Sequence, residues 1–573
     1  MMKKLFVFTL VLLLCGFSHA QVSSKQKSDV KIIAKGGYFK SSETPANSID
    51  AMMAAQRFGC YASTCEVTMT SDDYLVVCEE LSFRKKIGKD TSLEMLKNTG
   101  VKVTMLDEFL LRYKKFFIQN ENGKAGKELK PVRTLMKNPM KLMLLLPTTV
   151  SAKQQKVLLS MLGKSLADPE IRKQVEFCSS DLEQCYALAL VFPDVPVTCL
   201  KYAMSPREIR KHEGDFRLAY SCKILRENPK WMKDAVAMNM SVAVLNANSK
   251  SEVEEMMKLG VATFITENVA MVNAWAKKET LVKLMSFNIR MSGMPDVDGD
   301  NAWPNRKEAV VKMIAMENPD VMGVQEMLPD QQKYLRKELR DYSMVGVGRD
   351  DGRSEGECMG IFYKKNRFSL LDSGTFWLSQ TPEMASLGWD AACKRTVTYV
   401  QLKDNQSGKT FYYFNTHLDH VGMIARQESV KLICEQIRKL VRDTNSVFIL
   451  GGDMNSSSAD PIFDPLIGEW KKVLKPDLTR NAETAMAKVG ESQVPNHSPV
   501  AKSKSLMKPC RESAWETDNQ ITYNAYGKGK PAQIDHYFSS QNTDNLIYQT
   551  VRMNYGVPYI SDHYPVTLIF TLK

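Results

Sequence analysis

The stretch SVFILGGDMNSS, residues 446–457, runs from apolar residues through two glycines to Asp453 and Asn455. The apolar run from Val447 to Leu450 predicts a buried β-strand. Side chains two residues apart on an extended chain point to the same side, so the carboxylate and the amide would project together beyond the strand's end. An isolated pattern of this kind is also compatible with a turn capped by an Asp or Asn side chain. Its meaning therefore depends on the ends of the other strands.

Five further stretches of the C-terminal half carry a polar side chain at the end of an apolar strand. They are LMSFN ending at Asn288, PDVMGVQE ending at Glu326, YFNTHLDH with His417, QIDHYF with Asp535, and SDHYP with Asp562 and His563. Any one of these residues could be structural, but all of them together predict a common site. The hard oxygen ligands Asn288, Glu326 and Asp562 suit Mg²⁺, or alternatively Mn²⁺, better than zinc.

These residue types suit a metal-assisted attack of water on phosphorus. Asp453, beside Asn455, could orient the water and accept its proton. His417 and His563 could donate hydrogen bonds to phosphoryl oxygens. A carboxylate behind His563, for which Asp535 is the candidate, would orient the ring and favour its charged form.

In order along the chain, SFN, QE, NTHLDH, GDMN, IDHYF and SDHYP resemble the motifs of the endonuclease/exonuclease/phosphatase superfamily over about residues 281–571. The resemblance implies a four-layered α/β sandwich (DNase I-like), with the site at the top of its two sheets. It implies metal ligands at Asn288, Glu326 and Asp562, and catalytic residues at His417, Asp453, Asn455, Asp535 and His563.

Residues 298–306, 346–357 and 374–379 resemble a secreted bacterial branch of that superfamily. The candidates for the rim of the site, where substrate would bind, are Trp303, Arg306, Arg349, Glu357, Trp377, Trp389 and Arg395. Aromatic rings could stack on a sugar, a base or a headgroup, and arginines could clamp phosphate. The alternative is that the tryptophans lie in the core and the arginines form structural ion pairs.

Residues 31–277 alternate short apolar strands with amphipathic helices, which predicts a (β/α)8 TIM barrel. From residue 281 the strands become longer and the helices sparser. We therefore expect two domains, a barrel over 21–280 and a sandwich over 281–573. Almost no spacer separates them, so they should be in contact. Residues 484–513, rich in Ser, Lys and Pro, predict a long surface loop.

The barrel resembles the glycerophosphodiester phosphodiesterase family, but its expected catalytic residues are replaced. Lys35 and Gly36 stand where the family has His and Arg, Ala46 replaces a metal-binding Glu, and Cys78 replaces the second catalytic His. Of the family's Glu-x-Asp only Glu66 remains. The resemblance thus implies an inactive barrel, which either binds an anionic ligand through Lys35 or serves as a scaffold.

The N-terminal residues 1–20 predict a secretory signal peptide, with Lys3 and Lys4 before a short apolar stretch. We expect a secreted or periplasmic protein, and lipid attachment at Cys15 is less favoured because Leu14 precedes it. No transmembrane segment is expected after it. Eleven cysteines remain after cleavage, and we expect mostly buried single thiols. Cys60 with Cys65, or Cys178 with Cys185, could form a local disulfide.

The sequence thus predicts a secreted Mg²⁺-dependent phosphoesterase that hydrolyses a phosphodiester or a phosphomonoester. The substrate could be a phospholipid headgroup, a sugar phosphate or a nucleic acid. Residues 281–573 carry 36 Lys and Arg against 35 Asp and Glu, which weakly disfavours a long duplex. The alternative is a non-catalytic protein that binds phosphorylated ligands. The oligomeric state stays open.

Overall fold

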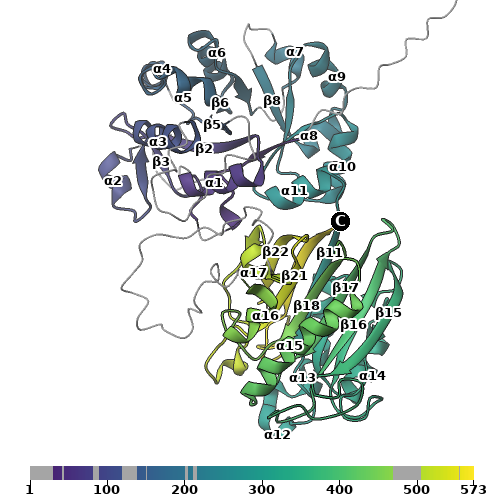
Figure 1. Cartoon of the computed structure of the whole chain (residues 1–573). Helices are drawn as coiled ribbons and strands as arrows, with labels where there is room; N and C mark the ends of the chain where they lie inside the picture. Colours follow the sequence, from purple (N-terminus) through teal and green to yellow (C-terminus); the bar gives the residue numbers. More distant parts are fainter. Residues whose placement is uncertain are drawn as a thin grey trace, which may run out of the picture.

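The computed structural model describes residues 30–573, except 42–43, 82–89, 119–138, 150, 201–203, 211–215, 469–504 and 554. The predicted signal peptide lies outside the described residues. The chain forms two parts that follow one another in sequence, an N-terminal barrel and a C-terminal pair of sheets (Figure 1).

Eight parallel strands close the barrel in the order β1-β10-β9-β8-β7-β6-β5-β2, with β2 pairing back to β1. They are β1 Lys31–Ala34, β2 Ala62–Met69, β5 Lys141–Leu145, β6 Val175–Ser179, β7 Val197–Cys199, β8 Phe216–Ser221, β9 Val242–Leu245 and β10 Thr263–Thr266. Strands β3 Leu75–Cys78 and β4 Val103–Met105 extend β2 as an antiparallel hairpin. The predicted parallel barrel is therefore confirmed.

Helices between successive strands cover the outside of the barrel. They are α1 Ile49–Phe58, α2 Leu93–Lys97, α3 Leu106–Tyr113, α4 Ala152–Ser165, α5 Pro169–Gln174, α6 Leu182–Val191, α7 Pro206–Ile209, α8 Cys222–Glu227, α9 Lys230–Ala237, α10 Lys250–Lys258 and α11 Val269–Ala276. Many begin with a Ser or Asp whose side chain accepts a backbone N–H, as Ser48 does for α1 and Asp181 for α6. Inside the barrel, small and apolar side chains such as Ile33, Met143 and Ile265 pack together.

The C-terminal part contains two mixed sheets. One has the order β13-β14-β12-β11-β23-β22-β20 and the other β15-β16-β17-β18-β21-β19. The first comprises β11 Thr280–Asn288, β12 Val321–Met327, β13 Tyr342–Val345, β14 Cys358–Lys364, β20 Glu516–Thr517, β22 Asp544–Thr550 and β23 Val566–Leu572. The second comprises β15 Phe368–Trp377, β16 Thr396–Asp404, β17 Thr410–His417, β18 Val447–Asp453, β19 Met507–Pro509 and β21 Asp535–Ser540.

The two sheets face each other across an apolar core that includes Leu284 and Ile361 of the first and Val400 and Ile449 of the second. Helices cover the outer faces, α13 Trp303–Glu317 and α14 Pro329–Glu338 on one side and α15 Met423–Leu440 on the other. The short helices are α12 Pro295–Asp298, α16 Asp464–Ile467 and α17 Cys510–Ser513. This arrangement has the four layers expected of the DNase I-like sandwich.

One expectation about the fold was wrong for the described part of residues 484–513. The segment 484–513 is not entirely a surface loop, because Met507–Pro509 pairs with β21 as an edge strand and Cys510–Ser513 is helical. The eleven cysteines from Cys60 to Cys510 are free thiols, and all but Cys393 are buried. In the part of the chain that the structure describes, every helix is too short or too polar to cross a bilayer.

The barrel and the sandwich are in contact through an apolar interface. Trp515, which precedes β20, stacks on Tyr38 at 6.4 Å and meets Phe58 edge-on at 4.7 Å between ring centroids. The Tyr38 hydroxyl donates to Glu516 at 3.3 Å. Leu546 joins the core cluster of the barrel. The interface lies at the end of the sandwich where β11 begins (Figure 1).

We predict that Trp515→Ala lowers the free energy of unfolding by about 2–4 kcal/mol, since it removes a large aromatic side chain from a packed interface. Equilibrium denaturation in urea measures this. The control Tyr38→Phe keeps the ring and removes one hydrogen bond, so it should cost about 1 kcal/mol or less. An unchanged midpoint for Trp515→Ala would show that the interface contributes little to stability.

Candidate active site

The predicted site residues meet at the end of the sandwich opposite the barrel. Asn288 ends β11, Glu326 lies near the end of β12, and His417 ends β17. Across the second sheet, His417 is in register with Asp453, and Asp453 is in register with Asp535. Strand β11 has nine residues, so the eight steps of about 3.3 Å from its first to its last residue separate this edge from the barrel by roughly 26 Å.

The Asn288 side chain joins the two sheets at this edge. Its Nδ2 donates to Glu326 Oε1 and to Asp453 Oδ2, at 2.9 Å each. Glu326 belongs to the first sheet and Asp453 to the second, so one buried amide fixes the spacing of two carboxylates that come from different sheets. Glu326 has φ +60°, and the pairing of β12 with β14 shifts register between Val324 and Met327. This irregularity turns the Glu326 side chain away from the strand's regular alternation.

His563 lies between two carboxylates. Its Nδ1 is 2.8 Å from Asp535 Oδ2, and its Nε2 is 3.6 Å from Asp453 Oδ2. Burial alone would lower the pKa of His563, but the charges of Asp535 and Asp453 outweigh it and raise this pKa to about 10. The imidazole is therefore positively charged at neutral pH. The contact with Asp535 fixes the orientation of the ring.

Asp453 itself is 1% exposed. Burial raises its pKa to about 7, although the positive His563 lowers it. The carboxylate accepts the backbone N–H of Asn455 at its Oδ1, 3.0 Å away. A carboxyl group with a pKa near neutrality can exchange a proton at physiological pH.

His417 differs from His563 in charge. Burial lowers the pKa of His417 well below 6.5, and the nearby positive charges of Arg395, His563 and Arg349 lower it further. Asn455 Nδ2 donates to His417 Nε2 at 3.0 Å and to the Leu418 carbonyl at 2.9 Å. The neutral ring therefore carries its proton on Nδ1, which has no hydrogen-bond partner among the described residues.

Two of the residues expected to hold a metal, Glu326 and Asp562, are buried carboxylates close enough for their charges to interact. Burial raises the pKa of Asp562, and the neighbouring charge of Glu326 raises it further. Arg290 NH1 lies 4.0 Å from Asp562 Oδ2 and is mainly paired with Asp298, whose Oδ1 is 3.0 Å from Arg290 NH2. Adjacent carboxylates of this kind, with the amide of Asn288 beside them, fit a hard divalent cation.

Arg349, Glu357 and Arg395 form a charged cluster beside His417. Arg349 NH1 pairs with Glu357 Oε2 at 2.6 Å, and Arg395 pairs with Asp419 at 3.4 Å. Burial raises the pKa of Glu357 to about 6, although the positive charge of Arg349 lowers it. Arg349 Nε and Arg395 NH1 are buried donors without a partner among the described residues. With His417 Nδ1, they leave three donors available to an acceptor.

Three of the predicted rim residues are instead structural. Trp303 and Trp377 are 5% and 6% exposed. Arg306 is 1% exposed, and its guanidinium donates to backbone carbonyls, among them Ile560 at 3.1 Å. Trp389 is half-buried. Of the two alternatives for the tryptophans, Trp303 and Trp377 take the core position, because helix and strand packing buries them.

Sequence reasoning missed Arg290 and the residues that hold Arg395. Arg290 follows Asn288 by two positions, and that spacing could have placed it at the site. Cys393, Asp419 and His420 come close enough to suggest a metal site. However, Arg395 donates to both Asp419 and His420, with NH2 3.0 Å from His420 Nδ1. The guanidinium already neutralises this cluster and would repel a metal cation.

At the mouth of the barrel, Lys35 Nζ pairs with Glu267 Oε1 at 2.7 Å. Glu267, which follows β10, offsets the charge of Lys35, so the ion pair favours the scaffold alternative over anion binding through Lys35. The Thr64 hydroxyl accepts the Gly36 N–H at 2.8 Å, and Glu66 is buried. The ends of the barrel strands thus meet at the mouth, and Glu66 is the single carboxylate that remains at the position of the related family's Glu-x-Asp motif.

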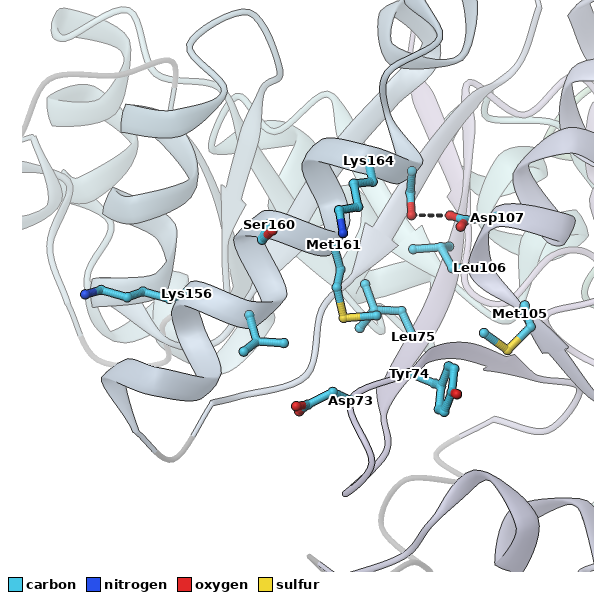
Figure 2. Close-up of a pocket in the computed structure, with 12 residues that line it drawn as sticks. Asp73, Tyr74, Leu75, Met105, Leu106, Asp107, Lys156, Ser160, Met161 and Lys164 are labelled. Carbon is cyan, nitrogen blue, oxygen red and sulfur yellow. Dashed lines mark hydrogen bonds between the residues drawn. The ribbon is translucent and has the colours of Figure 1, made fainter.

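A groove of about 590 Å³ lies on the outer surface of the barrel, between the β3–β4 hairpin and α4. Leu75, Leu106 and Met161 line its apolar part, and the Ser165 hydroxyl donates to Asp107 at its edge (Figure 2). None of the predicted site residues lines it. The groove is therefore separate from the candidate active site.

Residues 285–563 match the model of the Endonuclease/Exonuclease/phosphatase family. Among curated proteins, uncharacterized protein L388 of Acanthamoeba polyphaga mimivirus is 26% identical over 193 residues, 32% of this chain and 70% of that protein. Tyrosyl-DNA phosphodiesterase 2 of Danio rerio is 24% identical over 158 residues, 27% of this chain and 38% of that protein. The family match and these relatives point to a phosphoesterase or nuclease type of hydrolase for the C-terminal part.

Many solved structures are similar to parts of the chain, and three of them illustrate the two halves. An endonuclease/exonuclease/phosphatase from Bacteroides vulgatus is 28% identical, with a TM-score of 0.42, and covers 52% of this chain and 100% of its own. A mannosyl-6-phosphatase from Bacteroides thetaiotaomicron is 27% identical, with a TM-score of 0.41, and covers 51% and 99%. A glycerophosphodiester phosphodiesterase from Parabacteroides distasonis is 23% identical, with a TM-score of 0.37, and covers 43% and 97%.

We predict that Asp535→Asn lowers the pKa of His563 from about 10, because the carboxylate that contributes most is lost while burial still opposes the charged imidazole. NMR titration of the imidazole signals measures this shift. The control is Asp404→Asn, which removes a buried carboxylate that pairs with Arg367 outside the site. If His563 still titrated near 10 in Asp535→Asn, the assignment of Asp535 as its partner would be wrong.

Proposed function

We propose that the C-terminal domain is a Mg²⁺-dependent phosphoesterase in which Asp453 accepts a proton from the attacking water. The observation that carries this proposal is the contact of Asp453 with Asn288, Asn455 and two histidines of opposite protonation state. A structural carboxylate would not need a position between a charged and a neutral imidazole. The match to the Endonuclease/Exonuclease/phosphatase family supports the same chemistry.

In the proposed reaction, water adds to phosphorus and the ester P–O bond breaks. Asp453 holds the water and takes its proton, while the Asn455 N–H and Asn288 Nδ2 keep the carboxylate in place. His563, positively charged and held by Asp535, donates to a phosphoryl oxygen and stabilises the charge that develops there. His417 donates from its free Nδ1 to the substrate or to a water.

Glu326 and Asp562, with Asn288, are the residues that would hold the Mg²⁺ ion. When bound, it would neutralise phosphate charge as a Lewis acid. The buried Asp453, Asp535 and His563 also come together, but a protonated imidazole cannot ligate a metal. We therefore assign the ion to the side of the site that Glu326 and Asp562 form.

The unpartnered donors of Arg349 and Arg395 support an anionic substrate. Buried polar groups without a partner are costly, and a phosphate oxygen would satisfy them. They favour anion binding over a purely structural role for this cluster. We also propose that the N-terminal signal directs export and that the barrel serves as a scaffold. The proposal covers either a phosphodiester or a phosphomonoester as the substrate.

We predict that Asp453→Asn keeps the fold and lowers turnover of a phosphoester such as bis(p-nitrophenyl) phosphate by about 10²–10⁴-fold, because an amide cannot take the proton from water. Steady-state hydrolysis with Mg²⁺ measures this. The matched control Asp460→Asn, in a nearby turn, should keep normal turnover. Near-normal turnover of Asp453→Asn would refute the assignment of the base.

Glu326→Gln tests the metal assignment separately. One negative ligand is lost, so the Mg²⁺ concentration for half-maximal activity should rise at least tenfold, with partial recovery at saturating Mg²⁺. Titration of activity against Mg²⁺ measures this. An unchanged Mg²⁺ requirement would place the ion elsewhere.

We predict that the barrel contributes no hydrolysis of its own. The full chain with Asp453→Asn should release no glycerol phosphate from a glycerophosphodiester with Mg²⁺ or Ca²⁺, because the barrel mouth pairs Lys35 with Glu267, and Lys35 and Cys78 stand where the related family has its catalytic histidines. An enzymatic assay for glycerol phosphate measures this. Metal-dependent release by that variant would show that the barrel is active.

A further inference from the structure

Large apolar side chains are exposed at the catalytic end of the sandwich. Among the described residues of 281–573, eight of the eleven exposed large apolar side chains lie there, on segments that follow or flank the site. They are Met294 41%, Val297 63%, Met384 58%, Leu387 53%, Val421 63%, Met423 69%, Ile424 55% and Met553 59% exposed. Monomeric proteins expose scattered apolar residues, but clustering around one site indicates a contact surface.

The largest group, residues 421–424, is held rigidly beside the catalytic residues. The segment follows His417 by four positions, and Asp419 Oδ1 accepts the N–H groups of Val421 and Gly422 at 3.0 and 2.7 Å. Asp390 accepts the N–H groups of Ile424 and Ala425 at 3.3 and 2.6 Å. The backbone therefore presents these side chains to solvent in a fixed position.

The loop 381–392, which carries Met384 and Leu387, is attached to the same place. Asp390 belongs to this loop and caps the start of α15, and the Ala392 N–H donates to Asp419 Oδ2 at 3.2 Å. Residues 294–297 lie on another side, beside Arg290, whose side chain pairs with Asp298. Apolar side chains thus flank the site on more than one side.

The chemistry of these side chains distinguishes between possible ligands. They are aliphatic or thioether groups, whereas sugars and nucleic-acid bases are recognised by stacking on aromatic rings. Protein partners favour Trp, Tyr and Arg at the centre of an interface. Trp303 and Trp377 of this end are buried, and Trp389 of the loop 381–392 is half-buried, so the large apolar side chains exposed among the described residues of this end are aliphatic or thioether groups. Flexible aliphatic side chains around a phosphoester site fit the acyl region of a lipid layer.

The charges of the same end indicate which lipid surface fits. Its exposed carboxylates include Asp296, Asp300, Asp350, Asp351, Glu355, Glu383 and Asp390, and its exposed cations include Arg353, Lys528, Lys530 and Arg552. Acidic side chains therefore prevail at this end. An anionic surface attracts clusters of Lys and Arg and would repel this edge. A zwitterionic surface, whose outermost groups are ammonium cations, does not repel it.

We propose that the catalytic end of the sandwich docks on a zwitterionic lipid surface, with Val421, Met423 and Ile424 inserted among the acyl chains, and that its substrate is a phosphoester carried by a lipid. This inference rests on the proposed phosphoesterase function and selects one substrate class for it. The barrel, attached at the opposite end, stays clear of the surface. The three side chains anchor the protein, and the phosphoester headgroup enters the site beside them.

The test measures partition of the chain from residue 21 onto phosphatidylcholine vesicles by sedimentation. The variant Val421→Thr/Met423→Gln/Ile424→Thr keeps side-chain size but removes apolar surface, and its partition coefficient should fall about tenfold or more. The matched control Leu370→Thr/Leu371→Thr changes two exposed residues of β15 away from the site and should bind like the unmodified chain. Vesicles containing phosphatidylserine should bind more weakly.

Activity measurements separate this inference from the proposed function. The triple variant should hydrolyse a water-soluble phosphoester normally but a lipid phosphoester in vesicles at least tenfold more slowly. Absent vesicle binding by the unmodified chain, or equal binding by the triple variant, overturns the lipid surface and leaves the phosphoesterase intact. Vesicle binding that depends on these residues, in a chain that hydrolyses no phosphoester, refutes the proposed function while the surface stands.

Discussion

The buried amide of Asn288 is the contact on which the geometry of the candidate site depends. It is the described side chain that donates at once to Glu326 of the first sheet and to Asp453 of the second. Without it, the separation of these two carboxylates would follow from sheet packing alone. Because Asn288 is fully buried, its loss would also leave carboxylate oxygens without a donor, at a cost of about 1–3 kcal/mol each. Stability and site geometry therefore rest on the same two hydrogen bonds.

The spacing of the sheets behind Asn288 is fixed by polar groups in an otherwise apolar core. Gln325 Nε2 donates to Asn415 Oδ1 at 2.7 Å, and Asn415 Nδ2 donates to the carbonyls of Val324 and Gly360 at 3.0 Å each. These bonds join β12 and β14 of the first sheet to β17 of the second. On β12 and β17, Glu326 follows Gln325 directly and His417 lies two residues after Asn415. A directional hydrogen bond specifies register more narrowly than apolar contact does.

The two glycines before Asp453 allow this close packing. A Cβ at Gly451 would lie 2.4 Å from the Tyr537 ring, and a Cβ at Gly452 would lie 1.9 Å from the Thr416 carbonyl oxygen. Gly452 also has φ +148°, which side chains rarely adopt. The glycines thus bring β18 against its neighbours, so that Asp453 ends the strand level with His417 and Asp535. The polar strand end is therefore more than an Asx-capped turn.

The features of the fold and the site that depend on a local sequence pattern could be predicted. Strand alternation and a polar residue at each strand end are properties of a few consecutive residues, so the barrel and the convergence of Asn288, Glu326, His417 and Asp453 could be predicted. The choice between rim and core for Trp303 could not be made, because it is set by the packing of α13 against the first sheet. The pairing of Lys35 with a residue 232 positions away likewise requires closure of the barrel.

The barrel and the candidate active site lie at opposite ends of the sandwich, which limits what the barrel can contribute to catalysis. The barrel is attached through Trp515 at one end, and the proton-transfer groups are at the other, about 26 Å along β11. A substrate small enough to fit among buried groups at Asp453 cannot touch the barrel at the same time. At the barrel mouth, Leu145, Leu200 and Leu245 pack against the interior layer, and Lys35 is neutralised. The structure therefore favours a barrel that acts by holding and orienting the sandwich over one that shares in the chemistry.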